Sequence, residues 1–276
     1  MTETRFPPST QRQKVQSPIE MSAVLVSYNE GRHLGACLGA LDFCSEIIVV
    51  DLGSTDDSCE IARRMGARVL LREWVPYAPL VRSQGIEATQ NDWVVSIDPD
   101  MILPDGSYQR AVEMITDRTD LAIIQMSYQN YFKGKAVRYG RWGGVLPFFP
   151  TFVNKERVVV ETREHRGHFS PKAGYSAVSM PVRDGLILRH NWVDSLEELE
   201  EKLKRYTSGE VEARVNESRS NSIVADLWRT LRGVLDSLVL KRGVLQGWLG
   251  VRLALMSARY EWRVQRGVAA NQKGRG

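Results

Sequence analysis

The sequence has few cysteines, and no spacing that would link them. Its 276 residues include three, at Cys37, Cys44 and Cys59. An odd count without close metal-type spacing argues against a disulfide framework and against a zinc site. We therefore expect three free thiols in a reducing compartment, which favours a cytoplasmic location.

Long apolar runs are also missing. No stretch approaches the roughly 18 uninterrupted apolar residues that a membrane-spanning helix needs. Residues 1–20 are polar, contain Pro7, Pro8 and Pro18, and lack the apolar centre of a secretion signal. They predict a flexible N-terminal arm, on a protein that is soluble or lies on a membrane without crossing it.

What remains is ordinary globular composition, with 43% hydrophobic and 25% charged residues. Short apolar runs alternate with segments of helical periodicity, which predicts βαβ units and a mostly parallel sheet flanked by helices. The expected strands are Ser22–Ser27, Glu46–Val50, Arg68–Leu71 and Trp93–Ile97. Helices are expected between them, the first with Leu34, Cys37, Leu38 and Leu41 on one face.

The second half of the chain has a weaker pattern. A helix is expected from Asp105 to Asp117, and another from Ser195, with Glu198 as the partner in a capping box. Leu196, Leu199, Leu203 and Tyr206 would form the apolar stripe of this second helix. Further expected elements are a strand at Leu121–Ser127, a structured loop region over the site at Tyr128–Pro150, and edge strands at Val158–Val160 and Leu186–Leu188.

Acidic and amide side chains follow three of the predicted strands. The first strand leads into Tyr28-Asn29-Glu30, the second into Asp51-Leu52-Gly53-Ser54, and the fourth into Asp98-Pro99-Asp100. Ligands of such sheets bind at the carboxyl ends of the strands. These side chains are therefore predicted to converge on one rim.

Asp98-Pro99-Asp100 is the strongest single feature. Two carboxylates separated by one residue can hold a divalent cation that prefers oxygen ligands, and the cation can neutralise charge on a leaving diphosphate. Asp51 has two interpretations, a hydrogen bond to a base or ribose and the capping of its own turn. Asn29 and Glu30 are likewise either ligand contacts or the start of a helix.

These three motifs, in this order and spacing, resemble glycosyltransferase family 2 over about residues 21–101. The resemblance implies a GT-A fold, a nucleoside-diphosphate sugar donor, Mg²⁺ or Mn²⁺, and transfer with inversion. It implies that Tyr28, Glu30 and Asp51, with Asn29 beside them, contact the donor. Asp98 would lie near the ribose or sugar and share in the metal site of Asp100.

Later segments look like those of small bacterial transferases of the lipopolysaccharide-core type. They begin at Arg189-His190-Asn191-Trp192, at Lys204-Arg205-Tyr206-Thr207 and at Lys241-Arg242-Gly243-Val244, and the third runs to Trp248, with Tyr260 beyond it. The acceptor implied by this likeness is a saccharide or lipid-linked intermediate.

The sequence departs from such relatives where they often carry a His-Glu pair, because Arg166 follows His165. An inverting transfer needs a base for the acceptor hydroxyl, and a carboxylate is the usual choice. Glu164 is our candidate for this base, and Glu161 is the alternative. Glu164 could equally be a solvated surface glutamate without a catalytic role. His190 is a further candidate metal ligand, ahead of His165 and His168.

The C-terminal part is basic. Residues 228–276 contain ten Lys or Arg against Asp236 and Glu261, with tryptophans interleaved among leucines. This pattern suits helices lying on an anionic membrane, and it equally suits helices packed on the catalytic domain with a basic outer face. We expect these helices to be broken at Gly233, Gly243, Gly247 and Gly250.

The predicted organisation is an arm over residues 1–20, a GT-A catalytic domain over 21–221 and a basic helical extension over 222–276. One rival function is a sugar nucleotidyltransferase, against which the missing glycine-rich phosphate loop counts. The other is a non-catalytic basic protein that binds membrane or nucleic acid. It leaves the acids at three strand ends unexplained, so we expect no nucleic-acid partner.

Overall fold

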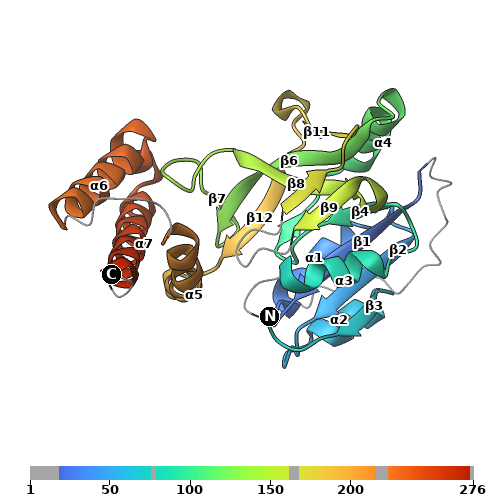
Figure 1. Ribbon diagram of the computed structural model, residues 1–276, viewed down its shortest axis with the longest axis horizontal. Helices are drawn as coiled ribbons and strands as arrows, with labels where there is room; N and C mark the ends of the chain where they lie inside the picture. Colours follow the sequence, from blue (N-terminus) through green and yellow to red (C-terminus); the bar gives the residue numbers. More distant parts are fainter. Residues whose placement is uncertain (1–18, 76–78, 162–167, 216–222, 274–276) are drawn as a thin grey trace, which may run out of the picture.

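The protein was analysed as a computed structural model, which describes residues 19–75, 79–161, 168–215 and 223–273. A ten-stranded mixed sheet forms the centre, and helices cover both of its faces (Figure 1). The main order is β3-β2-β1-β4-β8-β6-β12-β5, with β7 and β11 also paired to β6. Residues 1–18 of the predicted arm lie outside the described residues. Ile19 already packs on the core, and its carbonyl accepts a hydrogen bond from Tyr108 Oη at 3.1 Å.

The first half of the chain forms the predicted parallel units. Its strands are β1 (Met21–Ser27), β2 (Glu46–Asp51), β3 (Arg68–Leu71) and β4 (Trp93–Ser96), and its helices are α1 (Gly31–Gly39), α2 (Ser58–Arg64) and α3 (Pro79–Glu87). Alternate residues of β1 and β2 face opposite layers, because side chains alternate along a strand. Leu25 and Val49 pack with α1 and α2, whereas Val24 and Val50 pack with Val81 of α3.

The segment Tyr128–Pro150 is not the loop region that the sequence predicted. β6 (Leu121–Phe132) and β8 (Leu146–Asn154) pair antiparallel, and β8 also pairs with β4, so much of this segment lies inside the sheet. Aromatic residues misled the prediction because they line sheet surfaces as readily as loops. Phe149 of β8, which packs against the main core, is an example.

The remaining strands are β5 (Met101–Ile102), β7 (Lys135–Ala136), β9 (Val158–Glu161), β10 (His168–Pro171), β11 (Ser176–Ser179) and β12 (Leu188–Val193). Four of them complete the ten-stranded sheet, and β9 and β10 pair in a separate two-stranded sheet. Short 3-10 turns lie at Lys155–Arg157 (η1) and Val182–Asp184 (η2). β12 begins where the sequence predicted a strand to end. Arg189 to Trp192 therefore lie within a strand between β6 and β5.

The helices of the second half begin with α4 (Ser107–Asp117) and α5 (Leu196–Arg214). The predicted N-cap of α5 is confirmed, since Ser195 Oγ accepts a hydrogen bond from the Glu198 amide at 3.0 Å. The Glu198 carboxylate accepts a hydrogen bond from the Asp194 amide at 2.9 Å, one residue before the Ser195 amide that a capping box would use. Leu199 and Leu203 are buried as predicted, whereas Tyr206 is exposed.

The C-terminal part consists of α6 (Ile223–Leu235), a π-helical turn (η3, Asp236–Leu240), a 3-10 turn (η4, Gly243–Gln246) and α7 (Trp248–Lys273). The predicted breaks at Gly233 and Gly250 are wrong, because α6 and α7 run through them. A β-carbon on Gly250 would lie 1.9 Å from the Gly243 carbonyl oxygen. This glycine therefore permits close packing of η4 on α7.

α7 packs against α5 and shares a core with β12. Val137, Trp192, Leu199, Leu253 and Met256 belong to one buried cluster. The boundary predicted near residue 221 falls among residues outside the described ranges. Within those ranges, none of the helices has both the length and the apolar character of a membrane span.

Candidate functional site

Asp51 ends β2 and is fully buried. Its Oδ2 accepts hydrogen bonds from the amides of Gly53 at 3.0 Å and Ser54 at 2.9 Å, and its Oδ1 accepts one from Ser54 Oγ at 2.6 Å. A carboxylate has about four acceptor positions, so its own turn uses most of them. Asp51 shapes the loop after β2, and its expected contact with the donor stays a prediction.

Asn29 joins the ends of β1 and β2. Its backbone is left-handed, with φ of 54°, a conformation that asparagine tolerates better than most residues. Its amide donates to Ser54 Oγ at 2.9 Å, and its Oδ1 accepts from the Thr55 amide at 2.8 Å. Asp56 makes a second link, by accepting from the Gly31 amide at 3.0 Å. The two loops therefore form one connected rim.

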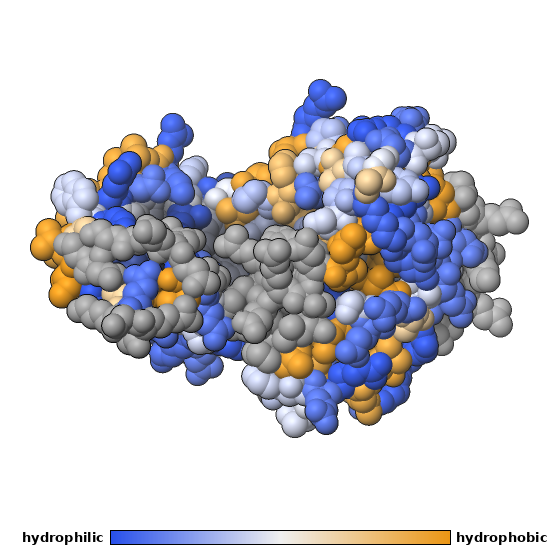
Figure 2. Space-filling model, viewed as in Figure 1, coloured by the Kyte–Doolittle hydropathy of each residue, from blue (hydrophilic) through white to orange (hydrophobic). Residues whose placement is uncertain are grey.

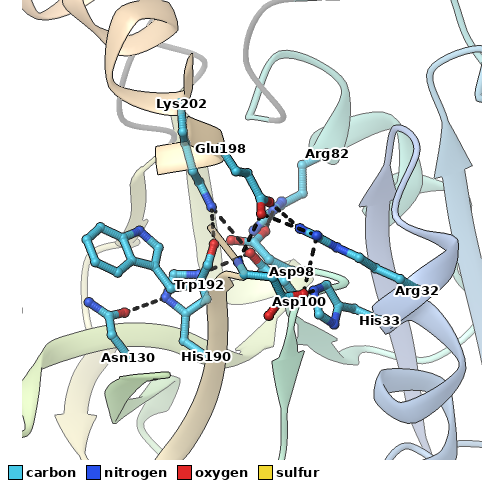
Figure 3. Close-up of polar contacts among 11 residues, drawn as sticks. Arg32, His33, Arg82, Asp98, Asp100, Asn130, His190, Trp192, Glu198 and Lys202 are labelled. Atoms are coloured by element: carbon cyan, nitrogen blue, oxygen red, sulfur yellow. Dashed lines mark hydrogen bonds and ion pairs between the residues drawn. The ribbon is translucent and has the colours of Figure 1, made fainter. Parts of the chain in front are cut away.

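Asp98 and Asp100 take different partners. Asp98 forms an ion pair with Arg82 of α3, whose guanidinium also donates to Ser96 Oγ at 3.3 Å. Asp100 is buried, and its side chain points toward β12 and α5 (Figure 3). Its Oδ2 lies 3.1 Å from His190 Nε2 of β12 and 3.4 Å from Lys202 Nζ of α5.

The environment of Asp100 favours its ionised form. Burial raises the pKa of this carboxyl, but the charges and hydrogen bonds of His190 and Lys202 outweigh burial and bring the pKa below its ordinary value. Burial lowers the pKa of Lys202, but the Asp100 charge outweighs that effect and raises it. The pair is therefore a carboxylate and an ammonium group.

Asn130 of β6 fixes a hydrogen on His190 Nδ1. Its Nδ2 donates to the Trp142 carbonyl at 3.0 Å, so its Oδ1 faces His190 Nδ1 at 2.7 Å. Nδ1 must then carry a hydrogen in either state of the ring. A protonated ring donates from Nε2 to the Asp100 carboxylate, whereas a neutral ring presents its Nε2 lone pair there. Two acceptors 3.1 Å apart need a proton or a cation between them. The donor set thus fits a divalent cation.

This pair is small for a metal site. Among the residues that the structure describes, no group of three or more His, Cys, Asp or Glu side chains is placed to hold a metal ion. Magnesium sites of nucleotide enzymes often use one or two protein ligands and complete the shell from phosphates and water. Asp100 and His190 are compatible with a site of that kind.

Glu30 lies at the start of α1, close to the same charges. Burial, together with the negative charge of Asp100, raises the pKa of this carboxyl from 4.5 to about 7. Its amide donates to Ser58 Oγ at 3.0 Å, which links it to the start of α2. A carboxyl that is half-protonated near neutral pH beside a candidate cation site is a candidate for a functional role.

Tyr28 is exposed, with 40% of its surface accessible, and its ring lies edge-on to that of Trp74, with centroids 6.5 Å apart. Trp74 is 54% exposed in the segment after β3. Exposed aromatic rings beside the Asp51 loop are suited to stacking on a planar base.

Glu164 and His165 lie outside the described residues. Glu161 and His168 lie in β9 and β10, where their backbones pair in a separate two-stranded sheet. The proposed general base therefore stays a prediction.

Four residues of this site were not singled out from the sequence, namely Trp74, Arg82, Asn130 and Lys202. The sequence did indicate that Lys202 faces inward, because it lies between Leu199 and Leu203, two residues of the predicted apolar stripe of α5. The other three had none, because only the fold brings the segment after β3, helix α3 and the middle of β6 to the site.

Parts of this chain are similar to several glycosyltransferases. The lipopolysaccharide core biosynthesis glycosyltransferase LpsC of Rhizobium meliloti is 23% identical over 178 residues, covering 63% of this chain and 59% of that protein. An uncharacterized glycosyltransferase of Rickettsia conorii is 34% identical over 82 residues, or 29% of each chain. A dolichyl-phosphate hexose transferase of Haloferax volcanii is 32% identical over 106 residues, covering 37% of this chain and 46% of that protein. The matches thus span about three tenths to three fifths of these relatives' lengths.

Solved structures show weaker similarity. Staphylococcus aureus TarS residues 1–349, solved with UDP-GlcNAc, matches with a TM-score of 0.35 and 20% identity, covering 41% of this chain and 35% of that one. Glucosyl-3-phosphoglycerate synthase of Mycobacterium tuberculosis, solved with Mn²⁺, UDP and glucosyl-3-phosphoglycerate, has a TM-score of 0.31 and 24% identity, covering 47% of this chain and 50% of that one. These scores are too low to support an argument about the site.

The family assignment rests on the sequence match. The model of glycosyl transferase family 2 matches residues 22–176, which contain all three strand-end motifs and more than half of the 276 residues. The mixed α/β fold that the resemblance implied is also present. The chain belongs to glycosyl transferase family 2.

Proposed function

We propose that this glycosyltransferase moves a sugar, with inversion, from a nucleoside-diphosphate donor to a saccharide or lipid-linked acceptor in bacterial envelope glycan synthesis. The observation that carries the proposal is the buried Asp100, paired with His190 at the rim that also holds the Asp51 loop. The similarity to the lipopolysaccharide core enzyme supports the acceptor class.

Asp100 and His190 would hold Mg²⁺ or Mn²⁺, with Asn130 keeping the Nε2 lone pair directed at the ion. When bound, the ion would stabilise negative charge on the leaving diphosphate. The Lys202 ammonium, 3.4 Å from Asp100, would donate to a phosphate oxygen as charge develops there.

The remaining residues would orient the donor. Tyr28 and Trp74 would stack on the base, and the Asp51 loop would contact the nucleoside. The Arg82 guanidinium would hold Asp98 toward the ribose or sugar. Glu164 would accept the proton of the acceptor hydroxyl, which then attacks the anomeric carbon from the face opposite the diphosphate.

Metal binding can be tested without turnover, by titrating Mn²⁺ and following the free-ion signal in electron paramagnetic resonance. We expect Asp100→Asn to weaken Mn²⁺ binding at least tenfold, in the presence of UDP or GDP, whichever binds the intact protein. Glu113→Gln, on the exposed surface of α4, is the matched control and should bind as the parent does. Unchanged Mn²⁺ affinity in Asp100→Asn would remove this residue from the metal site.

The reaction itself is tested by its products. Release of a nucleoside diphosphate from a nucleotide sugar supports transfer, whereas release of pyrophosphate would favour the nucleotidyltransferase. Glu164→Gln should keep donor affinity and lose more than tenfold in transfer rate, because an amide cannot accept the hydroxyl proton. A smaller loss would favour another base, such as Glu161.

A further inference from the structure

Helix α6 directs its apolar side to solvent. Ile223, Leu227, Leu231 and Leu235 recur at helical spacing, and their exposed fractions run from 48% to 59%. The fully buried residue of α6 is charged, since Asp226 is 3% exposed and pairs with Arg229 and with Arg266 of α7. A surface helix normally buries its apolar stripe and exposes its polar one. α6 does the reverse.

The turns after α6 continue this apolar surface. Leu240 is 77% exposed in η3, Leu245 is 61% exposed in η4, and Trp248 is 69% exposed at the start of α7. Together with Trp228 and the stripe of α6, these residues form what we call the outer face. Figure 2 shows hydrophobic surface at the α6 end of the molecule. Exposed apolar surface on this scale marks an interaction site in a folded protein.

Positive charge surrounds the outer face. Arg232, Arg242 and Arg252 are all exposed, and Lys241 is exposed beside them but pairs with Asp236. The Arg252 guanidinium lies 5.5 Å from the centre of the Trp248 ring. The two acids between residues 223 and 248 are neutralised, since Asp226 is buried in its ion pairs and Asp236 Oδ2 lies 3.3 Å from Lys241 Nζ.

We propose that the outer face binds the surface of an anionic lipid bilayer. Tryptophan and leucine would enter the boundary between headgroups and acyl chains, while arginine and lysine contact the anionic headgroups. A second copy of the chain fits less well. A symmetric dimer through this face would bring its arginines and lysines against those of the partner copy.

The outer face is joined firmly to the candidate active site. The segment after β7 connects the two, since the Gly140 amide donates to the Lys241 carbonyl at 2.9 Å and the Arg141 amide to Ser237 Oγ at 3.1 Å. One residue further, the Trp142 carbonyl accepts from Asn130, the residue that orients His190. A bilayer bound at this face would therefore lie in a fixed orientation relative to the site.

The test uses the full chain and vesicle flotation, with no donor or acceptor added, so its outcome does not depend on the proposed reaction. We expect at least tenfold stronger binding to vesicles of phosphatidylcholine with phosphatidylglycerol than to phosphatidylcholine alone, and partial release at high salt. The double substitution Trp228→Ser with Leu231→Ser should reduce binding at least tenfold. Leu71→Ser, at a residue 60% exposed on β3, is the matched control and should bind as the parent does.

Circular dichroism melting establishes that each variant is folded. Because the comparison of the two vesicle types uses the unaltered protein, it tests the proposal even if the double variant fails to fold. No binding of the intact folded protein to anionic vesicles would overturn the proposal, as would undiminished binding by a folded double variant. A concentration-dependent dimer in analytical ultracentrifugation, abolished by the double substitution and accompanied by no vesicle binding, would assign the face to self-association instead.

Discussion

Replacing Asp51 separates the two roles that the sequence allowed for it. Its carboxylate is fully buried and accepts three hydrogen bonds from Gly53 and Ser54. A hydrogen bond to a charged group contributes about 1.5–3 kcal/mol, but Gly53 is exposed and its amide can bond to water once the carboxylate is gone. We therefore expect Asp51→Ala to lower the free energy of unfolding by about 2–4 kcal/mol, less than the sum of three such bonds.

Asp51→Asn is the informative partner. Its amide oxygen can still accept from the two backbone amides, and its NH₂ group can donate to Ser54 Oγ, so we expect a loss below about 1.5 kcal/mol. Urea unfolding followed by circular dichroism gives both values. If the free energy of unfolding of the alanine variant lies within about 0.5 kcal/mol of the parent's, Asp51 does not stabilise the loop after β2.

The same two proteins test donor binding by calorimetry with UDP or GDP. If Asp51 contacts the nucleoside, the folded asparagine variant should bind about tenfold more weakly, because a neutral acceptor replaces a charged one. Unchanged affinity in this variant would leave Asp51 with its structural role alone.

Three further predictions concern other parts of the molecule. The native Glu30 carboxyl keeps its proton up to about pH 7 and the unfolded one only to 4.5, so the free energy of unfolding should fall as pH rises through that window. With EDTA present, Glu30→Gln should flatten the dependence of stability on pH and stabilise the protein at pH 8 by up to about 3 kcal/mol. The same pH dependence in both proteins would contradict this. Trp74→Ala should weaken binding of UDP or GDP by about 1–3 kcal/mol in calorimetry if the ring stacks on the base, whereas Leu71→Ala should not. Gly250→Ala should lower the melting temperature, because its β-carbon would lie 1.9 Å from the Gly243 carbonyl oxygen. This clash should outweigh the preference of alanine over glycine in a helix, about 1 kcal/mol. A higher melting temperature would show that η4 moves aside freely.

Local sequence predicted the first half of the fold well. The apolar runs that became β1 to β4 are short and bounded by turn residues, and the helices between them have buried faces such as Leu34 and Leu38. In such units the secondary structure and the burial pattern agree residue by residue. In the second half, the strand predicted at Leu121–Ser127 is present as the first part of β6. The rest of β6, β8 and most of β12 were missed, because their strand character depends on pairing within the sheet and not on an apolar run.

The candidate site divides in the same way. The sequence by itself placed Asp51, Asp98 and Asp100 at one rim, because parallel strands present their carboxyl ends together. Only the tertiary structure gave those carboxylates their partners, since Arg82 comes from α3, His190 from β12 and Lys202 from α5. The outer face of α6 shows the same limit. Its periodicity is visible in the sequence, but a stripe of leucines looks the same whether it faces a core or solvent. The buried Asp226 settles the direction, because its ion partner Arg266 lies 40 residues away on α7 and is brought to it only by folding.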